Sequence, residues 1–130
     1  MVRAEVAAGG RAGFLFASVY HSVLFTVPYQ SVNNANSAAS ETDSVLTWVP
    51  SGCTATTLSV FSHQTNTVTV TLRAGTPGSM ANTALVCSVA PGAACTVSGN
   101  VTVAAGDFVD YNMTGSSGTG LGIWTALACN

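Results

Sequence analysis

A run of alternating side chains between residues 66 and 73 constrains the fold more than any other feature of this sequence. Val68, Val70 and Leu72 are separated by threonines, and the run ends in Arg73. Successive side chains of a β-strand point to opposite faces, so the pattern predicts a strand with one buried face and one hydroxyl-covered face. Comparable strand-like runs cover residues 45–49, 56–62, 84–89, 100–103, 108–114 and 121–129.

Turns rich in glycine and proline separate these runs, for example at residues 75–78 and at Pro91-Gly92. Strands that recur every 8–12 residues or so are typical of an antiparallel sandwich or barrel. No stretch of ten residues shows the apolar stripe of an amphipathic helix. The sequence therefore predicts an all-β fold.

We divide the chain into an N-terminal arm (residues 1–30), a small polar linker or loop (31–43) and a β-sandwich (44–130). The arm has strand character and is apolar on both faces. Two interpretations are open: it is the first strand of its own sandwich, or it is donated to the sheet of the next subunit by β-augmentation. The arm residues that would make these contacts are Phe14, Phe16, Val19, Tyr20, Val23, Phe25 and Val27.

Charged side chains are scarce. The chain has three arginines, no lysine and five carboxylates among 130 residues, whereas about a quarter of the residues in a typical soluble domain are charged. Hydroxyl, amide and small side chains can be buried against a neighbour without stripping water from an ion. We therefore expect a subunit covered by copies of itself. Three arginines cannot neutralise the several phosphates that nucleic-acid binding needs, so no nucleic-acid partner is expected.

The longest apolar-looking stretch, residues 12–27, contains His21 and three hydroxyl side chains. It is shorter than the roughly 20 residues of a membrane-spanning helix, so we expect no membrane span. Arg3 and Arg11 give the chain a basic start, but Glu5 interrupts it and no small-x-small cleavage site follows. We therefore expect no removable secretion signal.

Four cysteines suggest two disulfides. Cys87 and Cys95 flank a Pro-Gly turn, and a hairpin at this turn would bring them within bonding reach, leaving Cys53 and Cys129 as the second pair. Four buried free thiols are the alternative. No zinc site is expected, because no CxxC or HxxxH spacing occurs. Disulfides without a leader fit a particle that is oxidised after its cell lyses, or a thermophilic cytosol.

The order of features from residue 40 to residue 130 resembles a known group of proteins. A Ser-Glu-Thr-Asp run at 40–43, the strand at 67–73, the run at 84–88, Cys95 and the run at 103–107 occur in this order. They resemble bacterial jelly-roll modules related to the tips of exosporium collagen-like glycoproteins, which are similar to tumour-necrosis-factor-like sandwiches. The subunits of endospore appendages are similar too, although their cysteine-rich N-terminal connector is missing here. The resemblance implies a jelly-roll sandwich of about eight strands, self-association as trimers or fibres, and no catalysis.

Few residues are candidates for chemistry, and we expect no catalytic site, cofactor or metal. His21 is expected to form a hydrogen bond at an interface, with a pH-sensing role as the alternative. His63 is expected in a surface loop. Asp107 and Asp110 are three residues apart in a strand and should point to opposite faces.

Three further sets of residues allow a second interpretation. Glu41 and Asp43 could join another loop in a calcium site. Core or interface packing is expected for the larger aromatic residues, with a sugar-stacking platform as the alternative. These residues are Tyr20, Tyr29, Trp48, Tyr111 and Trp124. Asn100 and Asn112 each begin a sequon for N-glycosylation.

Together these observations predict a non-catalytic structural subunit that self-assembles into an extracellular filament, appendage or coat on a cell or spore surface. Its partners would be copies of itself, as a homopolymer or homotrimer, joined through the N-terminal strand. A virion capsid or fibre protein is the first alternative. A surface carbohydrate-binding module that uses Trp48 or Trp124 is the second.

Overall fold

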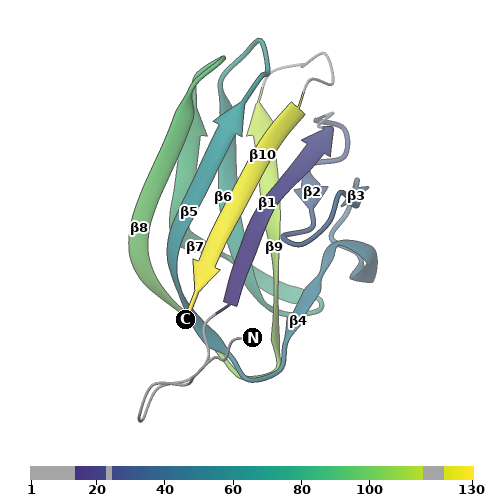
Figure 1. Ribbon diagram of the computed structural model, residues 1–130. Coiled ribbons are helices and arrows are strands. Elements are labelled where there is room, and N and C mark those ends of the chain that lie inside the picture. Colours follow the sequence, from purple (N-terminus) through teal and green to yellow (C-terminus); the bar gives the residue numbers. More distant parts are fainter. Residues whose placement is uncertain (1–13, 23–24, 116–121) are drawn as a thin grey trace.

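A computed structural model describes residues 14–22, 25–115 and 122–130, which form two antiparallel sheets packed face to face (Figure 1). The first sheet has the order β1 (Phe14–Ser22), β10 (Gly122–Cys129), β5 (Cys53–Ser62), β8 (Ala94–Val103). The second has the order β3 (Ser37–Ala38), β2 (Tyr29–Gln30), β9 (Asp107–Gly115), β6 (Val68–Thr76), β7 (Ser79–Val89), and β4 (Thr47–Val49) also pairs with β9. The helical segment in the described residues is one short 3-10 turn, η1 (Asp43–Val45).

The strand order is that of a jelly roll. The chain passes repeatedly from one sheet to the other, so that β1 pairs with the distant β10, while β2 and β4 pair with β9. The strands β6 and β7 form the one long hairpin of the second sheet, joined by a tight turn at Pro77-Gly78. This arrangement is the double-sheet architecture that jelly rolls share. The prediction of an all-β antiparallel jelly-roll sandwich is confirmed.

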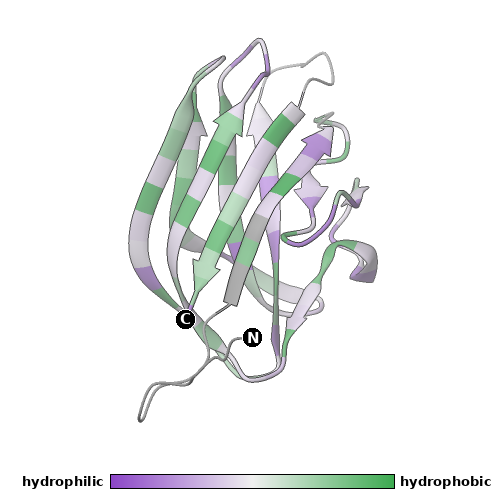
Figure 2. Cartoon of the chain, in the orientation of Figure 1, coloured by the Kyte–Doolittle hydropathy of each residue, from purple (hydrophilic) through white to green (hydrophobic). Residues whose placement is uncertain are grey.

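The core is the apolar layer between the two sheets. Val68, Val70 and Leu72 are completely buried, as the alternation of their strand predicts. Leu58 on β5 and Leu127 on β10 meet them from the first sheet. Figure 2 shows the same alternation in β5 and β10 as successive green and near-white residues. Each strand therefore turns one set of side chains inward and leaves the other set outside.

The polar segment expected as a linker belongs to the second sheet. The pairing of the chain with β9 stops after Gln30, which lies opposite Tyr111. It resumes at Thr47, which lies opposite Val109. We call residues 31–46, which contain β3 and η1, the excursion. Short polar side chains of the excursion form hydrogen bonds with the backbone of its turns. For example, the Ser31 Oγ accepts a hydrogen bond from the backbone N–H of Asn33 at 3.2 Å. Such side chains replace the missing backbone partners, so the segment is held in place beside the sheet.

Residues 14–22 of the arm form a strand of the chain's own sandwich. Its strand β1 pairs along β10 of the same chain, with a register shift between Phe16 and Val19 that lets both side chains face inward. This arrangement is the first of the two interpretations that the sequence left open. Phe25 packs against the core and Val27 is half-buried, while Tyr20 points outward. Val23 and the side chain of Phe14 lie outside the described part of the chain.

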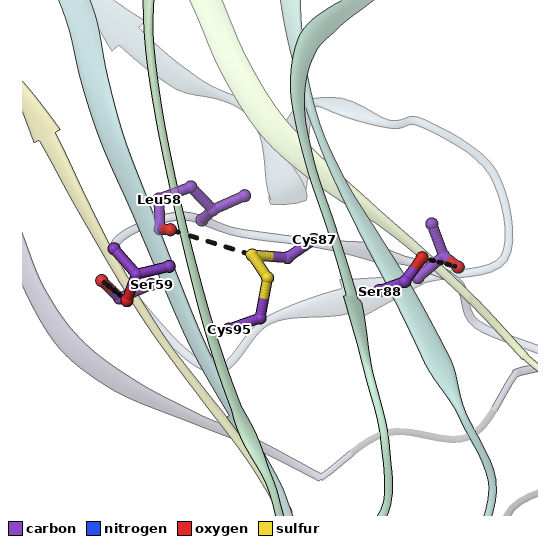
Figure 3. Close-up of a disulfide and its surroundings, with 7 residues drawn as sticks. Leu58, Ser59, Cys87, Ser88 and Cys95 are labelled. Carbon is purple, nitrogen blue, oxygen red and sulfur yellow. Dashed lines mark hydrogen bonds between the residues drawn. A yellow bond between two sulfur atoms is a disulfide. The ribbon is translucent and has the colours of Figure 1, made fainter.

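Two disulfides tie the strands together. Cys53 on β5 bonds to Cys129 on the neighbouring β10, with Cα atoms 5.4 Å apart, and Cys87 bonds to Cys95, with Cα atoms 5.9 Å apart. The expected hairpin between Cys87 and Cys95 is wrong. β7 pairs with β6 and β8 pairs with β5, so the turn at Pro91-Gly92 crosses from one sheet to the other. The second disulfide therefore joins the two layers, and its Cys87 Sγ lies 3.8 Å from the carbonyl oxygen of Leu58 (Figure 3).

We predict that the two disulfides contribute unequally to stability. The bridge between Cys53 and Cys129 closes a loop with a sequence separation of 76, and the other closes one of 8. The loop-entropy relation gives about 4.5 kcal/mol for the longer loop and about 2.6 kcal/mol for the shorter one. Urea unfolding of the double variants C53A/C129A and C87A/C95A should therefore show the larger loss in the first. Equal losses would contradict the entropic origin.

Candidate interaction surface

The outward side chains of the first sheet form a surface that carries no charge among the described residues. We call it the uncharged face. Its members are hydroxyl, alanine, amide and aromatic side chains that alternate with the inward core residues of the same strands. They are Ser18 and Tyr20 of β1, Trp124, Ala126 and Ala128 of β10, Thr57, Ser59 and Phe61 of β5, and Ala94, Thr96, Ser98 and Asn100 of β8.

An aromatic row crosses this face. Tyr20 lies opposite Trp124 in the register of β1 and β10, and Trp124 lies opposite Phe61 in the register of β10 and β5. The ring centroids of Tyr20 and Trp124 are 5.1 Å apart, and those of Phe61 and Trp124 are 5.9 Å apart. His63 extends the row, with its ring 5.1 Å from both Phe61 and Trp124. Tyr20 is 47% exposed and Phe61 is 37% exposed, so these rings remain available for contact.

Gly122 explains how the Tyr20 ring can approach the sheet so closely. A Cβ atom at Gly122 would clash with the Cε1 atom of the Tyr20 ring. Because Gly122 has no side chain, the Tyr20 ring can cover the start of β10. Aromatic residues often cover glycines in sheets in this way. The sequence alone does not reveal this contact, because it depends on the pairing of β1 with β10.

A shallow hollow of about 190 Å³ lies beside the aromatic row. Trp124 and Phe61 border it on one side, and Ser59 and Thr96 contribute hydroxyl groups that lie 3.1 Å apart. Figure 3 shows the Ser59 hydroxyl turned away from the disulfide between Cys87 and Cys95, toward the outside of its sheet. The hollow thus combines an apolar wall with hydroxyl groups and has no charged lining residue.

All charged residues of the described chain lie away from this face. Glu41 and Asp43 belong to the excursion, Arg73 to β6, and Asp107 and Asp110 to β9. Arg3, Glu5 and Arg11 lie outside the described residues. The charge of the described sandwich is therefore confined to the second sheet and its excursion.

Arg73 organises this charged side. Its Nε and Nη2 donate hydrogen bonds to the Glu41 carboxylate at 2.8 and 2.9 Å, and its Nη1 donates to the Asn82 side-chain oxygen at 2.7 Å. The guanidinium also lies 6.0 Å from the centre of the Tyr29 ring. A two-pronged contact between arginine and a carboxylate is among the stronger polar interactions in proteins. It fastens the excursion to the second sheet.

Asp110 lies opposite the break between β2 and β4 and pairs with Arg73 in the register of β6 and β9. Its residue is fully buried, and neither carboxyl oxygen accepts a hydrogen bond from a donor among the described residues. Its neighbour is the Glu41 carboxylate, an acceptor, so the two groups can bond only if one of them carries a proton. Burial, followed by the contact with Glu41, raises the pKa of Asp110 to about 9. Asp110 therefore holds the shared proton at neutral pH and donates it toward Glu41.

Because of the proton on Asp110, we expect the free energy of unfolding to depend on pH. The folded protein keeps a proton on Asp110 that the unfolded chain releases above about pH 4, so the unfolding free energy should fall as the pH rises toward 9. The limiting slope is about 1.4 kcal/mol per pH unit. In Asp110→Asn the amide can donate to Glu41 without titrating, so urea unfolding at pH 7 and pH 9 should show a flatter profile. Asp107→Asn, on the same strand, should keep the wild-type slope; a wild-type slope in Asp110→Asn would refute the shared proton.

A second buried polar cluster lies inside the sandwich. His21 on β1 is fully buried, and its Nε2 lies 2.9 Å from the Thr125 hydroxyl on β10. The ring of Tyr111 on β9 lies 6.2 Å from the His21 ring. Burial lowers the pKa of His21 to about 4, although the nearby Gln30 side chain acts in the opposite direction. His21 is therefore a neutral core histidine at neutral pH; it is not exposed at a surface.

The remaining candidate residues are dispersed. Tyr111 is in the core, and Trp48 is 60% exposed on β4, in the other sheet from Trp124. Of the two sequons, Asn100 is exposed on β8 and Asn112 is half-buried on β9. Glu41 is committed to Arg73, and the described residues contain no group of three or more side chains placed to hold a metal ion.

Phe61 is the member of the aromatic row that the sequence did not single out; His63, expected in a surface loop, is exposed directly after β5. Phe61 lies in the strand predicted at 56–62, two residues before His63, and this spacing was the available signal. Their contact with Trp124 could not be inferred, because it requires the register between β5 and β10.

Searches against protein-family models and against curated proteins find no match to this sequence. In the described part of the chain, no helix has the length and hydropathy needed to cross a bilayer.

Proposed function

We propose that this chain is a non-catalytic structural subunit that self-assembles into an extracellular filament, appendage or coat, and that copies meet through the uncharged face. The observation that supports this proposal is the distribution of charge. A continuous sheet surface without a charged side chain lies opposite the second sheet and its excursion, which together carry all the described charges.

Such a surface can be covered at low cost. Burying a charge without a partner is expensive, whereas alanine loses little on burial, and a hydroxyl loses little when it keeps a hydrogen bond, as those of Ser59 and Thr96 do with each other. The exposed rings of Tyr20 and Phe61 and the half-buried ring of Trp124 are aromatic groups, which often dominate the energy of an interface. A neighbouring sheet could pack on this face at the usual distance of about 10 Å.

The N-terminal strand has a part in this proposal without being donated. β1 stays in its own sheet and contributes Ser18 and Tyr20 to the uncharged face. The contact would therefore be made by a finished sheet, and the arm would be one of its four strands. The two disulfides are compatible with an oxidising location outside the cell.

A carbohydrate-binding module is the second candidate, because the rings of Trp124 and Phe61 border a hollow that also presents the hydroxyls of Ser59 and Thr96. Glycan-array binding that is lost in Trp124→Ala and kept in Trp48→Ala would favour it, provided that assembly is unchanged. A virion protein with the same fold would assemble into closed shells or spikes, which electron micrographs distinguish from filaments.

Matched charge insertions test the proposed interface. Thr96 and Ser88 are both exposed strand residues in cross-strand hydroxyl pairs, Thr96 with Ser59 on the first sheet and Ser88 with Thr69 on the second. Thr96→Lys should weaken self-association at least tenfold, because the interface would have to bury an ammonium group. Ser88→Lys should leave it unchanged.

Sedimentation over a range of concentrations and electron microscopy measure the outcome, and thermal unfolding checks that both variants fold. A wild-type protein that stays monomeric at millimolar concentration would overturn the proposal. So would equal effects of the two lysines.

A further inference from the structure

The attachment of β1 depends on a buried histidine. β1 is an edge strand of the first sheet, and β10 is its single strand partner in the described structure. His21 enters the space between the sheets from this edge strand and is 0% exposed. An edge strand can leave a sheet without disturbing other strand pairs, so a polar group buried on such a strand has a direct effect on whether it stays.

The surroundings of His21 suit a neutral ring. The Thr125 hydroxyl meets Nε2, and Nδ1 has no hydrogen bond of ordinary length with a described residue. Gln30 of β2 and Tyr111 of β9 contact the ring from the second sheet. Tyr111 is the titratable group among these neighbours, and burial raises its pKa well above 10, so it stays uncharged. No described carboxylate faces the ring: Asp110, the acid next to Tyr111, points to the opposite side of β9 toward Glu41.

We propose that His21 makes the attachment of β1 acid-sensitive, so that protonation of its ring releases β1 and opens the edge of β10 to the β1 strand of a second copy. An imidazolium in this position would be a buried cation with no counter-charge, and such a group is strongly destabilising. Once β1 is released, the ring is hydrated and the cation is stable in water. On return to neutral pH, β1 can pair with its own β10 or with the β10 of another molecule, which is a strand exchange between identical chains.

The pKa of His21 sets how strongly acid should favour the release of β1. The pKa of His21 is about 4 in the folded protein and 6.5 in its ordinary state. By linkage, the population with β1 released should rise on the order of 50- to 100-fold between pH 7.5 and pH 4.5. The inference does not depend on the uncharged face, since it concerns only the edge of β10.

Amide hydrogen exchange tests the release. The backbone amides of residues 14–22 should lose protection at pH 4.5 by roughly the factor above, after correction for the pH dependence of the intrinsic exchange rate. The other edge strand of the same sheet, β8, contains no ionisable side chain and serves as the internal reference. Unchanged protection of β1, or an equal loss in β1 and β8, would overturn the proposal.

Two histidine variants locate the cause. His21 and His63 are the two histidines of the chain. His63→Gln should keep the acid response of β1, and His21→Gln should lose it, because glutamine can bond to Thr125 without titrating. Each variant is compared with itself at the two pH values, so a uniform change in stability does not alter the result. If His21→Gln does not fold, an NMR titration of the single imidazole in His63→Gln decides, and an ordinary pKa near 6.5 would overturn the proposal.

Strand exchange is tested by an acid pulse. Concentrated protein is held at pH 4.5 and returned to pH 7.5, and its dimer content is measured by size exclusion with light scattering before and after. Wild type and His63→Gln should gain dimer after the pulse, and His21→Gln should not. Release of β1 without any gain of dimer would overturn the exchange step.

Discussion

The apolar layer between the two sheets is the constraint on which the rest of the molecule depends. Because side chains alternate along a strand, placing Val70 and Leu72 inside also decides that Thr71 and Arg73 lie outside. A shift of one residue would expose the core and bury the outer set, so the register is strongly specified. The chemistry of each outer face is therefore a by-product of core packing, and the uncharged face exists because the outward positions of four strands hold no ion.

The two buried ionisable groups follow a common rule. Desolvation pushes Asp110 toward its protonated form and His21 toward its unprotonated form, so both are neutral near neutral pH. The ion pair that the described structure does keep, between Arg73 and Glu41, lies on the outer side of the second sheet, where both side chains are partly exposed. The interior thus avoids charge by adjusting protonation, and the two groups oppose each other in their effect on acid and alkaline stability.

Much of the fold follows from local patterns. The alternation around Val70 and the turns between runs predict the strands and the all-β class, and the cysteines joined in the structure are the pairs that the Pro-Gly turn favoured. The hairpin at Pro91-Gly92 was wrong because a tight turn looks the same in sequence whether it stays in one sheet or crosses to the other.

The sites were harder to predict. The contacts of Asp110 with Glu41, of His21 with Thr125, and of Trp124 with Phe61 each join residues far apart in the chain. They depend on the registers of β9, β10 and β5, which no local pattern reveals. The sequence also placed the polar segment after Gln30 as a linker, since its composition is that of a flexible chain.

The interrupted strand formed by β2 and β4 has a further consequence. Gln30 and Thr47 are anchored on either side of Asp110, so the excursion departs from and rejoins β9 almost at the same point. The entropy of closing a loop grows only slowly with its length. Extra residues grafted within this segment, away from Glu41, would leave the pairing of the strands untouched. The sandwich therefore offers a natural position for carrying a foreign peptide on its charged side while its opposite surface stays unaltered.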